Sequence, residues 1–274
     1  MKKEIAVLID LKNSRGHSTT QRLNLQKYIM DLVNHLNEIF DKSLIKKVVF
    51  NGGDCVQGVF DSLLAAFLYV RLFKMLMYPH EIYIGIGFER IEIKIDELDS
   101  FGQDGTAYHL ASAAIDVAKD SAGHRMLLSS NRRSDVVVNA MFSMLLQIFD
   151  GRSVVQNDAA LLIELLSPIS INNILRVDKI RNLFLFVKNK RSEVNEKTIF
   201  ADIDMEDFDV IEVNVAHVSD NRLFSTQGKI RGLVSHIAKI TDRKEQTIGK
   251  NVKNAKTYQE RNFAIAILLF LDNA

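Results

Sequence analysis

The fold is decided by the stretch VVFNGGDCVQGVF at residues 48–60, in which two short apolar runs flank a pair of glycines. Residues 46–50 and 56–60 have the length and the β-branched and aromatic content of strands. Two adjacent glycines permit the positive backbone angles of a tight hairpin. The stretch therefore predicts a β-hairpin with Asp54 at its tip.

The pattern outward from this hairpin predicts alternating strands and helices. Lys3 to Asp10 is a β-branched run typical of a buried strand, and a polar loop follows it over residues 11–20. Apolar spacing predicts helices at 23–40, 62–77 and 108–119, the second of them capped by Asp61. Strands are expected at 81–88, 90–95 and 126–129, and a glycine-containing loop at 101–105. The resulting order contains β-α-β-β-α-β, so we expect an α+β fold with a ferredoxin-like antiparallel sheet.

The remaining sequence suggests further domains. Helices are expected at 134–150 and 154–166, and strand-rich segments at 176–188 and 193–215. A helix–turn–helix is expected at 226–240 and 244–256, with a turn and cap at 241–243. A buried terminal helix is expected at 263–271. Pattern changes predict domains at 1–150, 151–220 and 221–274, the middle one of uncertain fold. The acidic run at 202–209 is interpreted as a solvated loop, with a metal cage as the alternative.

Composition excludes several classes of protein. A chain of 274 residues with 47% hydrophobic and 25% charged residues is typical of a soluble globular protein of about two domains. The formal net charge of +1 favours neither a general nucleic-acid binder nor an acidic surface protein. The single Cys55 excludes an intrachain disulfide, and the longest apolar runs are too short to span a bilayer, so we expect a cytoplasmic location without membrane attachment.

Two carboxylates are the candidates for chemistry. Asp10 ends the first strand and Asp54 lies in the hairpin, and these strands are neighbours in the expected sheet. Two carboxylates so close favour a shared cation, and Mg²⁺ (or Mn²⁺) with the phosphates of a nucleoside triphosphate fits. The alternative is structural: Asp54 shapes the hairpin and Asp10 caps the following loop.

Residues near these carboxylates are suited to hold phosphate. Glycine lets the backbone approach a polyphosphate closely, and amide, hydroxyl and cationic groups donate to phosphate oxygens. The candidates are Gly52, Gly53, Lys12, Asn13, Ser14 and Arg15.

Four blocks together resemble the bacterial SatD family. They are IAVLIDLKNSRG (5–16), VVFNGGDCVQGVF (48–60), EIYIGIGFERI (81–91) and DGTAYHLASAAIDVAKD (104–120), and the resemblance covers roughly residues 3–130. The same blocks are more distantly similar to class III nucleotide cyclases and GGDEF-type diguanylate synthases. That resemblance implies a nucleotide-cyclase-type sheet, metal ligation by Asp10, Asp54 and the carbonyl of Leu11, and a homodimer; the sequence offers residues 67–77 as one apolar helix for it.

The blocks also depart from the cyclase pattern. His109 and Ala113 stand where a cyclase has asparagine and arginine, so His109 is the catalytic candidate and the arginine role has no occupant. Lys119 or Arg125 would reach the phosphates only if the helix geometry brought them there. The lysine that reads a purine in cyclases also has no counterpart. Metal and phosphate binding is therefore better supported than turnover.

The tail resembles the helix–turn–helix that such proteins carry. Its second helix offers side chains suited to duplex DNA: Lys244, Gln246, Thr247, Lys250 and Lys253. Three functions stay open: an enzyme that cyclises or links nucleoside triphosphates, a nucleotide-sensing DNA-binding regulator with little or no activity, and an interaction module that keeps only the fold.

Overall fold

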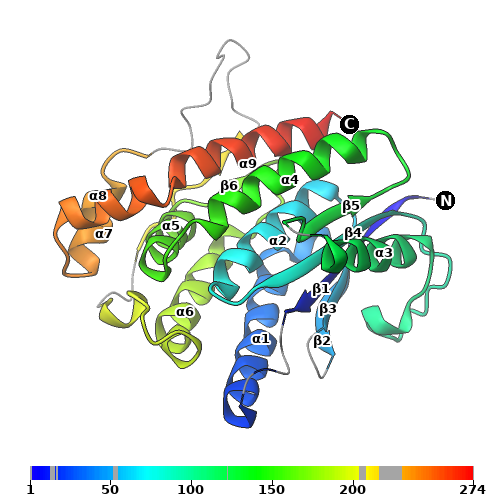
Figure 1. Ribbon diagram of the computed structural model, residues 1–274, viewed down its shortest axis with the longest axis horizontal. Coiled ribbons are helices and arrows are strands. Elements are labelled where there is room, and N and C mark those ends of the chain that lie inside the picture. The colour runs from blue at the N-terminus through cyan, green and yellow to red at the C-terminus, as the bar shows by residue number, and fades with distance from the viewer. Residues whose placement is uncertain are drawn as a thin grey trace.

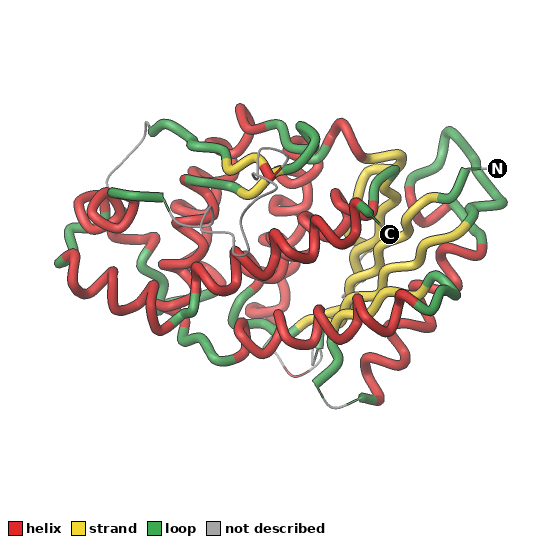
Figure 2. Tube along the Cα trace, turned by 90° about the horizontal axis from the view of Figure 1, so that it is seen from above, coloured by secondary structure: helices red, strands yellow, loops and turns green. Residues whose placement is uncertain are grey.

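The computed structural model describes residues 2–12, 16, 18–51, 55–121, 123–203, 208–215 and 230–273. Its N-terminal part is a five-stranded sheet covered by helices, and its C-terminal part is largely helical (Figure 1). Seen from above, the strands form one layer at one end of an elongated molecule (Figure 2). The α+β class is therefore confirmed. Every helix within the described ranges is too short or too polar to cross a bilayer.

The sheet has the strand order β2-β3-β1-β4-β5. Its strands are β1 (Glu4–Leu11), β2 (Leu44–Asn51), β3 (Cys55–Phe60), β4 (Ile82–Glu89) and β5 (Met126–Ser129). The first four pair antiparallel, but β5 runs parallel to β4. The prediction of an antiparallel sheet was wrong for this strand, because a helix connects β4 to β5 and returns the chain to the same end of the sheet.

The predicted hairpin strands are confirmed, and the next ribbon is not. Asn51 at the end of β2 pairs with Cys55 at the start of β3, and residues 52–54 between them lie outside the described residues. The strand predicted at residues 90–95 is reduced to an isolated bridge between Ile93 and Asp104.

Three helices cover the sheet. They are α1 (Thr19–Ile39), α2 (Leu63–Met77) and α3 (Thr106–Asp120). A capping box between Ser18 and Gln21 starts α1. The cap of α2 is Ser62, not Asp61 as predicted from sequence. From Leu64 to Met77, α2 is buried throughout, so its apolar residues belong to the core and offer no surface to a second copy.

The C-terminal part is built from helices that pack on one another and on α1, α2 and β5. Its helices are α4 (Ser134–Asp150), α5 (Val154–Leu166), α6 (Ile180–Val194), α7 (Leu233–Ile240), α8 (Glu245–Asn254) and α9 (Thr257–Asp272). The short strands β6 (Ile169–Ser170) and β7 (Val213–Asn214) form a two-stranded parallel sheet. Short 3-10 helices lie at Asp41–Ser43, Ser100–Gly102, Val177–Lys179 and Phe200–Asp202.

The middle segment differs most from its prediction. Residues 176–188, predicted to be strand-rich, fall mainly in α6, which buries Ile180, Leu183, Phe184 and Val187 at helical spacing. Of the described residues between 193 and 215, only β7 forms a strand. Within the acidic run, residues 204–207 lie outside the described residues. The buried terminal helix is confirmed as α9.

Both edges of the large sheet are closed by asparagine side chains. On β2, Asn37 from α1 donates to Val48 O (2.7 Å) and accepts from Val48 N (3.0 Å). On β5, Asn139 from α4 donates to Leu128 O (2.9 Å) and accepts from Leu128 N (2.7 Å). Each carboxamide imitates a neighbouring strand at the middle of an edge, where unpaired backbone groups otherwise invite another strand.

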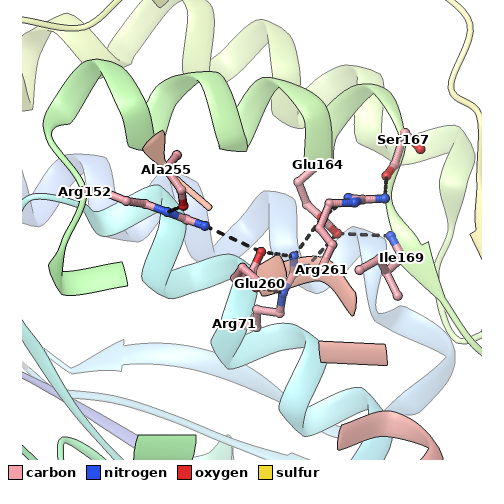
Figure 3. Close-up of polar contacts among 8 residues, drawn as sticks. All are labelled: Arg71, Arg152, Glu164, Ser167, Ile169, Ala255, Glu260 and Arg261. Carbon is pink, nitrogen blue, oxygen red and sulfur yellow. Dashed lines mark hydrogen bonds and ion pairs between the residues drawn. The ribbon is translucent and has the colours of Figure 1, made fainter. Parts of the chain in front are cut away.

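A buried network of charges joins distant parts of the chain (Figure 3). Arg71 on α2 donates to Glu260 on α9 (Nε to Oε1, 2.6 Å) and to Glu164 on α5 (Nη2 to Oε2, 2.9 Å). Arg261 also pairs with Glu164 and donates to Ser167 O at 2.7 Å. Arg152 completes the network through Ala255 O (3.0 Å) and Glu260 (3.8 Å). The three predicted domains each contribute residues to it.

The network favours the charged forms of Glu164 and Arg71. Burial acts to raise the pKa of Glu164, but Arg71 and Arg261 outweigh it and lower the pKa to about 2. Burial acts to lower the pKa of Arg71, and the two carboxylates outweigh it, so that pKa is raised. Apolar residues from Ile5 to Leu271 belong to one hydrophobic cluster around these charges.

Candidate functional site

The position of Asp10 follows from the alternation of side chains along β1. Ile5, Val7, Ile9 and Leu11 join the main core, whereas Ala6 and Leu8 pack on the opposite face with α3. Because side chains alternate in a strand, Asp10 lies on the α3 face. Its side chain is 18% exposed at the carboxyl end of the central strand.

Two glycines bring α3 unusually close to this face. A Cβ on Gly85 would lie 2.0 Å from Ala111 O, and one on Gly87 would lie 1.9 Å from Ala107 O. Strand β4 therefore tolerates no side chain at these two positions under α3. The close approach places Lys119, near the end of α3, in an ion pair with Asp10.

The strands on either side of Asp10 supply its nearest backbone neighbours. Asp10 pairs with Cys55 on β3 and with Tyr83 on β4. Tyr83 packs against the small cluster of Ala114, Ala118 and Leu127 under α3. Gly52, Gly53 and Asp54 lie outside the described residues, and the chain continues from Asp54 directly into Cys55.

Lys12 is held by the start of β4. Its ammonium donates to Glu81 Oε2 at 2.6 Å, and its backbone N–H donates to Glu81 O at 2.9 Å. The hydrogen bond to Glu81 raises the pKa of Lys12, and the same bond lowers the pKa of Glu81. The other loop candidates, Asn13, Ser14 and Arg15, lie outside the described residues. Sequence reasoning missed Glu81; its only signal was a carboxylate opening the strand EIYIGIGFE.

Of the two cations proposed to compensate for the missing arginine, the structure places one at Asp10. Arg125 instead donates to Glu81 Oε1 at 2.7 Å and pairs with Asp150. Lys119 is the cation at Asp10. Because the position of Lys119 depends on how closely α3 packs on β4, the alternating glycines of YIGIG were the sequence signal for this contact.

His109 lies away from Asp10. It is in the first turn of α3, with its side chain 76% exposed and 3.4 Å from Asp104. Lys119 comes ten residues later, which corresponds to roughly 15 Å along a helix. Ala113, at the position of the cyclase arginine, is exposed. The structure therefore joins Asp10 with Lys119 and does not join it with His109.

The described residues alone do not make a metal cage. Within them, no group of three or more His, Cys, Asp or Glu side chains could hold an ion. Asp10 offers one carboxylate, next to the carbonyl of Leu11. A partly exposed ion pair such as Asp10 with Lys119 contributes about 1 kcal/mol or less, so a ligand can displace it. Asp54, the second predicted ligand, lies outside the described residues.

A second candidate surface lies on α8. Residues 241–244 connect α7 to α8, with Thr241 Oγ1 donating to Ile237 O at 2.7 Å. The predicted cap is wrong, because Lys244 precedes α8 and no side chain caps it. Ile248 and Val252 are the buried residues of α8. The side chains predicted to contact DNA are all exposed: Lys244, Gln246, Thr247, Lys250 and Lys253.

Comparison with known proteins places part of the chain in a family. The family model described as the SatD family matches residues 4–166, which include the whole sheet, α1 to α5 and the Asp10 region. No curated protein and no solved structure matches this chain.

Proposed function

This chain belongs to the SatD family, and from that premise and the geometry around Asp10 we propose that it binds a nucleoside triphosphate with Mg²⁺ or Mn²⁺. In this proposal it cyclises the nucleotide or links several. The site lies at the carboxyl end of β1, with Asp10, Asp54 and the carbonyl of Leu11 as metal ligands.

The strand topology supports this proposal. Elements β1 to β4 with α1 and α2 follow the order β-α-β-β-α-β, and the strands lie in the order β2-β3-β1-β4. This is the ferredoxin-like arrangement expected of a nucleotide-cyclase-type domain. Since one fold hosts many functions, the residues at Asp10 must carry the argument.

One observation carries the proposal: Asp10 pairs with Cys55 across β1 and β3. Cys55 directly follows Asp54 in the chain. Directly opposite residues on antiparallel strands have Cα atoms about 5 Å apart, and consecutive residues about 3.8 Å. The strand pairing thus brings Cys55, the residue that follows Asp54 in the chain, next to Asp10. This supports the proposal that the two carboxylates share a cation.

Lys119 has two roles in this proposal. Without a ligand, its ammonium compensates the charge of Asp10. With a metal–triphosphate present, the same ammonium turns to the phosphates, since its side chain is 43% exposed and carries a flexible stem. A metal bound here would lower the pKa of a ribose hydroxyl and compensate phosphate charge. Lys119 would then take the role of the cyclase arginine, whose position is occupied here by Ala113.

Thermal unfolding tests the binding step. Saturating Mg²⁺ and a triphosphate, at about 100 times the Kd, should raise the Tm of the wild type by roughly 5–10 °C. Asp10→Asn and Asp54→Asn should lose this rise, while Asp116→Asn, an exposed carboxylate on the same helix as Lys119, should keep it. An equal rise in wild type and both ligand variants would refute the site.

Product analysis tests turnover separately. The protein is incubated with all four triphosphates and Mg²⁺ or Mn²⁺, and products are separated by mass. Release of pyrophosphate with a cyclic or linked product is expected, and both should disappear in Asp10→Asn. Absence of pyrophosphate under every condition would reject the enzyme and leave a nucleotide-binding protein.

The exposed face of α8 favours a second candidate, a DNA-binding regulator with little or no activity. Its lysines would contact phosphates, and Gln246 and Thr247 would face base edges. Lys250→Ala with Lys253→Ala should weaken duplex binding and flatten its dependence on salt, whereas the exposed Lys197→Ala should change neither. A wild type that binds no duplex at low salt would contradict this candidate.

A further inference from the structure

Helix α4 is apolar on two opposite faces. One face packs into the core through Phe142, Leu145, Leu146 and Phe149. The other leaves Val136 75%, Val137 47% and Met144 58% exposed. Val136 is the most exposed large hydrophobic residue of the described chain. A helix that turns apolar side chains both inward and outward is typical of an element with a further partner.

Two other routes to self-association, the sheet edges and helix α2, are disfavoured in the described chain. The edge strands β2 and β5 have their central backbone groups occupied by Asn37 and Asn139. The apolar residues of α2 are inside the core. Helix α4 instead lies at the surface beside α9 (Figure 1).

The outward face of α4 is complementary to itself. Val136, Ala140 and Met144 are exposed and four residues apart, which makes one ridge of the kind that packs between helices. Along this ridge the small Ala140 lies between the larger Val136 and Met144. If a second α4 lies antiparallel across a two-fold axis at Ala140, Val136 meets the partner's Met144 and the two alanines allow close approach.

Charge also selects the antiparallel arrangement. Arg132 and Arg133 are exposed just before α4 begins. Asp150 at its end pairs with Arg125 but keeps 42% of its side chain exposed. A parallel pair would bring the arginines of both copies together, whereas an antiparallel pair places them toward the partner's Asp150. Opposed helix dipoles favour the same orientation.

We propose that two copies of this chain form a symmetric dimer through antiparallel contact of their α4 helices, with Ala140 at the two-fold axis. A two-fold interface presents the same patch from both copies, so one substitution acts twice. The proposal is independent of nucleotide binding, and assembly is the quantity that tests it.

Sedimentation equilibrium tests the interface by substitution. The wild type is expected to be dimeric at tens of micromolar. Val136→Glu and Met144→Glu should each weaken dimerisation by about 100-fold or more, because two charges enter an apolar contact. Val117→Glu is the matched control: Val117 is 54% exposed on α3, and its variant should stay dimeric. Circular dichroism confirms that all variants are folded.

Cysteine cross-linking tests the axis itself. In a Cys55→Ser background, Ala140→Cys should oxidise to a covalent dimer, because residues at the axis face their own copies within disulfide reach. Gln147→Cys, about 10 Å along the helix from the axis, should stay unlinked. A monomeric wild type at 100 µM or so, a dimer that survives Val136→Glu, or linkage at position 147 without linkage at 140 would each overturn the proposal.

Discussion

The chain contains two groups of charged side chains that differ in their access to water. Between α2, α5 and α9, Arg71, Glu164, Glu260 and Arg261 are at most 5% exposed. At the end of β1, Asp10 and Lys119 are 18% and 43% exposed, and nearby Glu81 is 42% exposed. The first group is enclosed, whereas solvent reaches the second.

This difference separates a structural role from a binding role. In a buried network the loss of one partner leaves an uncompensated charge, so the fold depends on every member. In a half-exposed pair water replaces a lost partner at little cost. Residues of the second kind can exchange partners without unfolding the chain, which is what a ligand site requires.

The largest effect is expected in the buried network. Glu260→Gln should lower the free energy of unfolding by about 3–5 kcal/mol, because Arg71 and Arg152 lose the carboxylate between them. The Tm should fall by about 10 °C, measured by calorimetry. The control Glu193→Gln, whose exposed pair with Lys190 is 2.8 Å long, should change the free energy by less than about 1 kcal/mol. If the two substitutions lowered the free energy of unfolding equally, the distinction between the buried network and exposed ion pairs would be refuted.

Acid should act on the same network. The pKa of Glu164 is about 2 in the folded chain against an ordinary 4.5, so folding favours its ionised form. Its contribution, on the order of 3 kcal/mol, is present above pH 4.5 and is lost as pH falls toward 2. Urea titrations across this range should show a smaller loss for Glu164→Gln than for the wild type. Identical pH profiles would show that Glu164 is not linked to stability.

Glu81 provides an intermediate test. Glu81→Gln removes the carboxylate shared by Lys12 and Arg125, both partly exposed. We expect a loss of about 1 kcal/mol, which salt reduces because the groups are screened. Denaturation at low and high ionic strength measures it. A loss of unfolding free energy as large as that of Glu260→Gln would show that Glu81 has a structural role like that of the buried network.

The smallest effect on stability is expected from breaking the ion pair between Asp10 and Lys119. Lys119→Met should change the free energy of unfolding by less than about 1 kcal/mol. In the same protein, the stabilisation by Mg²⁺ and triphosphate should decrease clearly, since a phosphate partner is gone. Val117→Met on the same helix is the control for both readouts. A large loss of stability, with the stabilisation by Mg²⁺ and triphosphate unchanged, would show that Lys119 has a structural role and not a binding role.

Much of the N-terminal fold was predictable because its signals are local. Alternation in β1, the glycine-containing hairpin and the helical spacing of α1 lie within short stretches. The parallel direction of β5 was missed, although a helix between neighbouring strands implies it. Four residues carry no signal of strand direction by themselves.

The middle segment shows where composition misleads. Residues 176–188 contain Val177, Ile180, Phe184 and Phe186, whose types favour strands. The spacing of the buried residues decides for helix α6, which Arg191 then fixes to Asp158 on α5 at 2.8 Å. That ion pair joins residues far apart in sequence, so no local pattern predicts it.

The candidate site was predictable only in part. Asp10 could be located because it ends a recognisable strand. Its partner Lys119 could not, because the contact depends on how far α3 descends over Gly85 and Gly87. The site role of Asp54 stays a prediction.

The network around Arg71 also governs how the protein can be dissected. The family match ends at residue 166, after Arg71 and Glu164 but before Glu260 and Arg261. A fragment cut there would lack α9, so Arg71 would lose Glu260, and the apolar core that α9 covers would be exposed. An exchange of C-terminal segments between relatives therefore requires that the glutamate and arginine at the start of α9 are transferred with the segment.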